Sequence, residues 1–99
     1  MDQPMKEMKI EIKVEDKDAT GHFANFANIA HSPEEFIVDF LFINPTPPPG
    51  FGKLISRIIL TPSHAKRLLM ALQDNIRKYE SVNGEIRMPQ VPPAMKNIQ

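Results

Sequence analysis

EEFIVDFLFINPTPPPGFGKLISRIIL, residues 34–60, is the stretch that decides the fold. Two runs rich in β-branched and aromatic residues flank a break of prolines and glycines, a pattern that predicts a β-hairpin with an ordered loop. With the loop centred near Pro48, antiparallel pairing sets Asp39 opposite Arg57. In this register one sheet face is almost entirely apolar, and the only acid of the two runs lies opposite their only arginine. A slip of one residue would lose both features, so we expect this pairing.

Two further strands are predicted before the hairpin. From Met8 to Val14, apolar residues alternate with Lys and Glu, which predicts an edge strand with one wet face. After a polar turn, the run from His22 to His31 keeps a two-residue rhythm. With a tight turn at residues 32–34, this run would pair back on the hairpin and bring Phe26 near Phe40. The expected sheet is therefore a four-stranded antiparallel meander.

After residue 60 the hydrophobic period lengthens, which predicts a helix. Thr61 suits the N-cap and Pro62 the first helical position, and Asn83 with Gly84 predicts the end of the helix. Apolar residues at three- and four-residue steps form one stripe, which consists of Ala65, Leu68, Leu69, Leu72, Ile76 and Tyr79. We expect an α+β fold in which this long C-terminal helix packs on one face of the sheet.

The chain of 99 residues has the size of one small domain. We assign residues 8–87 to this domain, residues 1–7 to a flexible leader, and residues 88–99 to a proline-rich tail without a regular period. The N-terminus resembles neither a signal peptide nor a membrane span, since it lacks a long apolar run. The cytoplasm is therefore the expected location, with no membrane partner.

Composition excludes several classes of function. Twelve basic and twelve acidic residues balance, so the chain offers no field of one sign to collect nucleic acid, and a nucleic-acid partner is not expected. The absence of cysteine excludes disulfides, thiol catalysis and cysteine-based metal sites. The spacing of His22, His31 and His64 matches no ligand motif, so we expect no metal and no cofactor. No catalytic arrangement of serine, histidine and acid is recognised.

One helix can cover only one face of the predicted sheet. The other face would carry seven large apolar side chains, namely Phe23, Ile29, Ile37, Leu41, Ile43, Ile55 and Ile59. A patch of that size is not typical of a soluble monomer, so we expect a second copy of the chain to cover it, across a two-fold axis. Asp39 and Arg57 would form an ion pair within this interface, with Asn25 beside them as a hydrogen-bonding partner.

Three pieces of sequence carry a resemblance to a known family. They are EFIVDF at 35–40, SRIILTPSHAKRLL at 56–69, and Tyr79-Glu80 with NGEI at 83–86. Together they resemble an uncharacterised prokaryotic family, domain of unknown function 3467, over roughly residues 22–86. The resemblance implies a small soluble cytoplasmic protein with no assigned activity and no catalytic residues to transfer. A looser similarity, in architecture alone, is to the export chaperone SecB, which assembles through its sheets.

Two further segments could contact a ligand or partner. Ser63, His64, Lys66 and Arg67 lie at the positive end of the predicted helix and would suit a phosphate or carboxylate. A solvated basic patch is the favoured interpretation, because no glycine-rich loop accompanies them. The loop containing Pro47, Pro48, Pro49 and Phe51 is stiff and presents an aromatic ring. It could contact a partner, or it could simply connect the two strands.

These observations favour a small non-enzymatic, homo-oligomeric protein-interaction module. Its partners would be further copies of itself, with another protein or an extended peptide as a further candidate. One alternative is a SecB-like chaperone that binds extended polypeptide by groove packing or strand addition. The other is a small-ligand binder or enzyme with a pocket between subunits around Asp39, Arg57 and Asn25.

Overall fold

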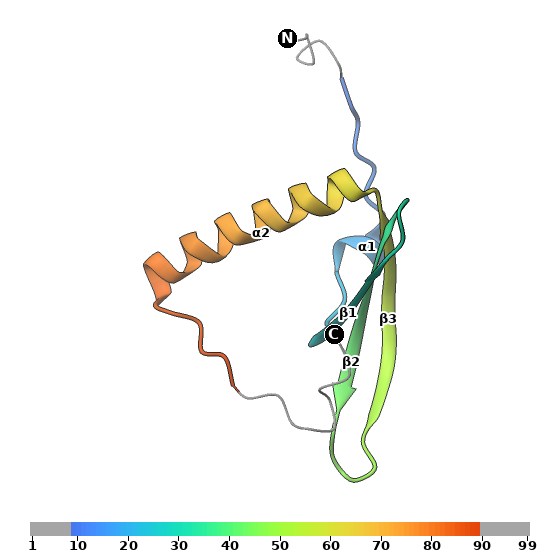
Figure 1. The fold of residues 1–99 in the computed structure, drawn as a ribbon, viewed down its shortest axis with the longest axis vertical. Helices are drawn as coiled ribbons and strands as arrows, with labels where there is room; N and C mark the ends of the chain where they lie inside the picture. The colour runs from blue at the N-terminus through green and yellow to red at the C-terminus, as the bar shows by residue number, and fades with distance from the viewer. Residues whose placement is uncertain (1–8, 90–99) are drawn as a thin grey trace.

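A computed structural model of the chain describes residues 9–89 (Figure 1). The elements in order are α1 (Asp16–Ala19), β1 (Phe26–His31), β2 (Phe36–Asn44), β3 (Phe51–Leu60) and α2 (Pro62–Asn83). The strands form one antiparallel sheet in the order β1-β2-β3. The predicted α+β class, with a meander followed by a long helix, is confirmed. The leader at 1–7 and all but the first two residues of the tail at 88–99 lie outside the described residues.

The register of β2 against β3 is confirmed over the first five pairs. Phe36 pairs with Leu60, and the pairs continue in step as far as Phe40. The register then shifts, because Leu41 pairs with Leu54 and leaves Ile55 as an extra residue in β3. The extra residue is a β-bulge, which bends a strand and alters its alternation of faces. The register that sets Asp39 opposite Arg57 also predicts Leu41 opposite Ile55, and this pairing is wrong.

Strand β1 pairs with β2 one residue away from the predicted register. Phe26 pairs with Leu41 rather than with Phe40. The cause is the turn, since the N–H of Ser32 donates to the carbonyl oxygen of Glu35 at 2.9 Å and leaves only two residues in the loop. A shift of one residue exchanges the two faces of a strand. Ile29 therefore lies opposite Val38, on the face that we predicted for the helix.

The predicted first strand does not form. Residues 9–15 belong to no helix or strand, and the side chains of Ile10 and Ile12 are 76% and 83% exposed. In place of the predicted polar turn, α1 begins after Glu15, whose carbonyl oxygen accepts hydrogen bonds from the N–H groups of Asp18 and Ala19. Acidic residues in the first turn of a helix are favourable, which accounts for a helical turn here. Residues 9–15 therefore supply no strand that pairs with β1.

Helix α2 begins directly after β3, as predicted. The side chain of Thr61 accepts a hydrogen bond from the N–H of His64 at 3.2 Å, and Pro62 occupies the first turn. The helix ends at Gly84, which adopts a positive φ of 90° and donates its N–H to the carbonyl oxygen of Glu80 at 3.0 Å. Such a φ favours glycine, so the predicted stop signal has a physical basis.

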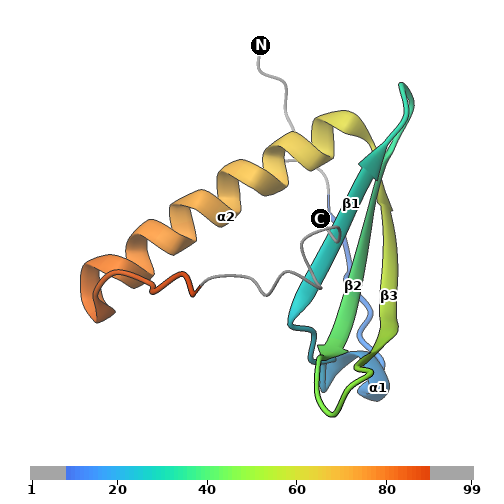
Figure 2. The same ribbon diagram turned by 60° about the horizontal axis from the view of Figure 1, so that its bottom comes forward.

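The helix does not lie along the sheet. Figures 1 and 2 show α2 starting against the upper end of the sheet and then moving away from it, so that helix and sheet form the two arms of a V. Of the described apolar residues, Val38 and Leu60 are the buried ones. The expectation of one helix covering one sheet face therefore holds only for the first turns of α2, and the core within one chain is small.

Candidate functional site

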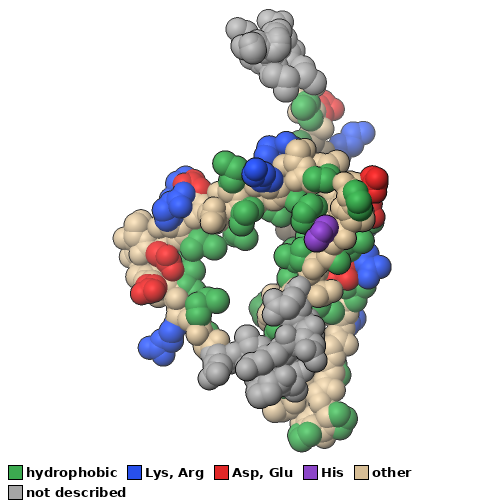
Figure 3. All heavy atoms as spheres, viewed as in Figure 1, with side chains coloured by type: hydrophobic (Ala, Val, Ile, Leu, Met, Phe, Trp, Pro, Cys, Tyr) green, Lys and Arg blue, Asp and Glu red, His purple; other side chains and the backbone are tan. Residues whose placement is uncertain are grey.

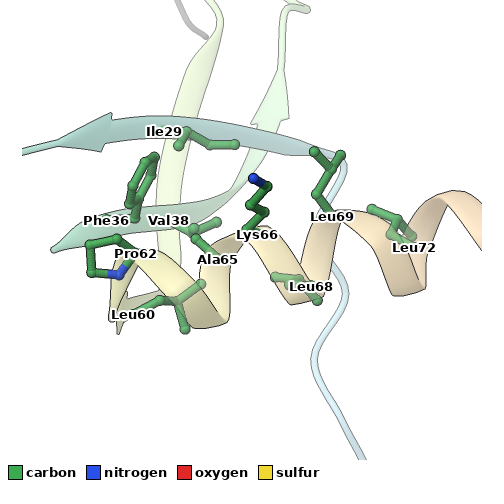
Figure 4. A pocket seen from close by; sticks show the side chains of 10 residues that line it. All are labelled: Ile29, Phe36, Val38, Leu60, Pro62, Ala65, Lys66, Leu68, Leu69 and Leu72. Atoms are coloured by element: carbon green, nitrogen blue, oxygen red, sulfur yellow. The ribbon is translucent and has the colours of Figure 1, made fainter.

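An apolar cleft lies where the first turns of α2 leave the sheet. Its volume is about 580 Å³. All three strands and α2 contribute to its walls, through Ile29, Phe36, Val38, Leu60, Pro62, Ala65, Lys66, Leu68, Leu69 and Leu72 (Figure 4). The lining has no carboxylate, imidazole, hydroxyl or thiol, so it provides no acid, base or nucleophile for catalysis apart from one lysine. The chemistry of this lining suits apolar groups rather than charged ones.

The apolar stripe of α2, defined above as Ala65 to Tyr79 at three- and four-residue steps, faces this opening. In Figure 3 the hydrophobic side chains of the helix gather on the side turned toward the sheet, across an open space. Leu69 and Leu72 are each 55% exposed, and Tyr79 is 54% exposed. The stripe continues for two turns past the cleft, since Ile76 and Tyr79 belong to it but do not line the cleft. A single chain thus leaves most of the stripe in contact with solvent.

Lys66 is the one charged residue in the lining. Figure 4 shows its side chain extending from α2 toward β1, which carries Ile29. A lysine can lay its alkyl chain along apolar surface while its ammonium group stays in water. Lys66 therefore contributes apolar area to the cleft. Lys66 belongs to the predicted basic cluster and lines the cleft, whereas Ser63 of the same cluster does not. The Oγ of Ser63 lies 3.5 Å from the Oγ1 of Thr61.

The predicted ion pair is present on the opposite face of the sheet. Arg57 donates from Nε to Oδ1 of Asp39 at 2.7 Å and from Nη2 to Oδ2 at 3.0 Å. These hydrogen bonds, and the positive charge behind them, lower the pKa of Asp39, and the same bonds raise the pKa of Arg57. Because the cleft is on the other face, the pair is no part of its lining.

Asn25 does not join this pair. Its Nδ2 donates to the carbonyl oxygen of Ile43 at 3.0 Å, and its Oδ1 accepts from the N–H of the same residue at 2.9 Å. The N–H of Asn25 also donates to the carbonyl oxygen of Leu41 at 3.0 Å. The amide therefore satisfies both backbone groups of Ile43. It extends the pairing with β2 to the residue that precedes β1. Asn28, which we did not single out, is the residue that pairs with Asp39 in the register.

The predicted oligomer face is divided between the two sides of the sheet. Ile37, Leu41, Ile43 and Ile59 share the Asp39 side by alternation and pairing, and Ile59 is 59% exposed. Ile29 lines the cleft instead. The ring of Phe23 packs edge to face on Phe42, with centroids 6.2 Å apart, and Ile55 occupies the bulge. The interface role of this face stays a prediction.

The proline-rich loop is ordered by its own contacts. The Oδ1 of Asn44 accepts hydrogen bonds from both the N–H and the hydroxyl of Thr46, at 3.1 and 3.2 Å. Phe51 packs on Phe42 with centroids 6.1 Å apart, so its ring belongs to the end of the sheet. Pro47, Pro48 and Pro49 remain exposed between them. A partner role for this loop stays a prediction.

The histidines and the helices carry no sign of a metal site or a membrane span in the described part of the chain. Within residues 9–89, no three side chains of the His, Asp or Glu type gather in a way that could hold a metal ion. His31 stacks on Phe36, with centroids 5.3 Å apart.

Within residues 9–89, neither helix combines the length and the apolar content that crossing a bilayer requires.

Comparison with known proteins places the chain in a family. The family described as "Protein of unknown function (DUF3467)" matches residues 1–88. The chain belongs to the DUF3467 family. The match extends further toward the N-terminus than the resemblance over residues 22–86, and so includes the segment at 9–15. No curated protein and no solved structure matches the DUF3467 chain, so the similarity to SecB is not shown.

Sequence reasoning found the stripe of α2 but missed the cleft. Helix length gives no signal for it. A helix of 22 residues spans about 33 Å, and a strand of ten residues such as β3 is also about 33 Å long. The cleft depends instead on the direction in which α2 leaves the sheet.

Proposed function

We propose that this DUF3467 protein is a non-enzymatic interaction module of the cytoplasm that works as a homo-oligomer. The observation that carries the proposal is the uncovered stripe of α2, whose first half forms one wall of the apolar cleft and whose second half continues past it. Exposed apolar patches that border a cleft mark interaction sites on soluble proteins. A lining without catalytic groups favours binding over chemistry.

The free energy gained by covering the stripe is comparable to the cost of association. Full burial of a leucine or isoleucine side chain stabilises by about 1.5–3 kcal/mol, so covering one that is half exposed contributes roughly 1 kcal/mol. Leu68, Leu69, Leu72, Ile76 and Tyr79 are each between 39% and 55% exposed. Two copies would together cover about ten such side chains, which yields roughly 10 kcal/mol. This sum lies within the range of about 4–15 kcal/mol that association costs in lost freedom of motion, before the sheet surface is counted.

Solution mass by light scattering across a dilution series tests this proposal. The wild type should form an oligomer that dissociates on dilution, and Leu69→Asp should be monomeric at every concentration. Met70→Asp is the matched control, because Met70 is 60% exposed and lies outside the cleft, on the opposite side of α2. A wild type that is monomeric throughout would overturn the proposal and leave the cleft to a small apolar ligand.

A further inference from the structure

We propose that two copies associate by exchange of α2, so that the stripe of each helix lies against the cleft and the sheet of the other copy. This inference rests on the proposed self-association and names the occupant of the cleft. Two apolar surfaces of one chain lack cover. They are the stripe of α2 and the sheet face that carries Ile29, Phe40 and Ile58.

The two surfaces cannot fully cover one another within a chain. Only the first turns of α2 approach the sheet, and the helix then diverges (Figures 1 and 2). Ile76 and Tyr79 lie past the cleft, and Ile58 and Phe40 lie on the sheet beyond its lining. The apolar residues left over on the helix therefore find their counterpart on the sheet of a second copy.

A two-fold axis makes this contact reciprocal. When the stripe of one copy meets the sheet of its partner, the same operation brings the partner's stripe to the first sheet, and the assembly closes at two. Related helices then run antiparallel if the axis is perpendicular to them, which is favourable for their dipoles. The chain carries no net charge, so two copies do not repel each other as whole molecules.

The area is close to what a stable dimer needs. Eight large apolar side chains on the two surfaces are between 37% and 56% exposed, namely Leu68, Leu69, Leu72, Ile76, Tyr79, Ile29, Phe40 and Ile58. Covering them removes roughly 400 Å² of apolar surface per copy. Since about 60% of an interface is apolar, the contact would bury roughly 650 Å² per copy. A standard interface buries about 800 Å² per partner.

Crosslinking tests the exchange, and the lack of native cysteine makes it direct. Two single-cysteine variants, Ile76→Cys and Ile58→Cys, carry tags of different mass that leave the thiols free. They are mixed at a dilution at which the oligomer dissociates, then concentrated and treated with a short bismaleimide. The expected product is a covalent dimer with one copy of each variant. Ser81→Cys replaces Ile76→Cys as the control, because it lies on the opposite side of the same part of α2 and should give no such product.

The outcomes separate this inference from the proposed function. An oligomer that gives no product between Ile76→Cys and Ile58→Cys, but crosslinks through Ile59→Cys on the Asp39 face, overturns the exchange and leaves self-association intact. A monomer overturns both. A measurement without substitutions guards against misfolded variants. In the wild type, amide hydrogen exchange in the second half of α2 should be slow at high concentration and become fast on dilution, and rates independent of concentration contradict the exchange.

Discussion

Arg57 holds Asp39 by two parallel hydrogen bonds, 2.7 and 3.0 Å long, from β3 to the neighbouring strand β2. The Asp39 side chain is 15% exposed, whereas that of Arg57 is 56% exposed. The guanidinium thus covers the carboxylate and shields it from water. The pair stands one residue before the shift at Phe40 and Leu41. The pair therefore favours the regular register of the hairpin directly beside the bulge, where the two strands could otherwise shift against each other.

This geometry predicts an acid-dependent stability. Because hydrogen bonds from Arg57 lower the pKa of Asp39 in the folded chain, the contribution of the pair is complete above the unfolded pKa, which is about 3.9. It is lost as the pH falls through the lower folded value. Thermal unfolding from about pH 6 down to about pH 2.5 should show a steeper loss for the wild type than for Asp39→Asn. Glu34→Gln, which removes an exposed carboxyl, should retain the steep loss, and equal slopes for all three proteins would contradict the prediction.

Asn25 should contribute to stability through its amide alone. Asn25→Ala removes two hydrogen bonds to the backbone of Ile43, each worth about 0.5–1.5 kcal/mol, so the free energy of unfolding should fall by about 1–3 kcal/mol. Asn25→Asp keeps the acceptor, loses the donor and places a negative charge beside a carbonyl oxygen. It should be no more stable than the alanine variant. Urea unfolding measures both, and an aspartate variant as stable as wild type would show that the donated bond is unimportant.

Gly50 should tolerate no side chain. A Cβ there would lie 2.5 Å from the carbonyl oxygen of Asn44 and 2.6 Å from the Cα of Pro45, and both are backbone atoms that cannot move aside alone. Gly50→Ala should lower the free energy of unfolding by about 1–3 kcal/mol or more. Gly52→Ala is the control, since the nearest atom to its Cβ would be the end of the flexible Ile43 side chain, at 3.2 Å, and the backbone oxygen of Phe42 would lie at an ordinary contact distance of 3.8 Å. Equal losses in the two variants would argue against a steric cause.

The start of α2 should depend on one hydroxyl. Thr61→Ala removes the acceptor for the N–H of His64 and should cost about 0.5–2 kcal/mol, whereas Thr61→Ser should cost little. Ser63→Ala changes a neighbouring hydroxyl that caps no N–H group in this turn. Helical circular dichroism during thermal unfolding reports each change. A loss on Ser63→Ala as large as that on Thr61→Ala would contradict the assignment of the cap.

The parts of the fold that follow local rules could be predicted from the sequence. The cap at Thr61, the stop at Gly84 and the pairing of Asp39 with Arg57 each depend on residues close in sequence or directly opposite in a hairpin. The errors arise where the outcome depends on small differences in turn geometry. One residue fewer in the turn before Glu35 exchanges the faces of β1, and Ile55 changes the alternation of β3 without any signal from glycine.

The candidate site could be predicted only in part. The composition of the α2 stripe is explicit in the sequence, but the direction in which the helix leaves the sheet is not. That direction decides whether the stripe is core or surface. The strand expected from Met8 to Val14 failed for a related reason, because alternation in residues 9–15 defines two faces without supplying a neighbouring strand to pair with.

One residue, Thr61, separates the last residue of β3 from the first residue of α2. Its backbone is extended, with ψ at 153°, as the following proline favours. Since α2 is about 33 Å long, a rotation of about 10° at this joint would displace the far end of the helix by roughly 6 Å. The backbone angles of this one residue therefore set the angle between α2 and the sheet, and with it the width of the cleft.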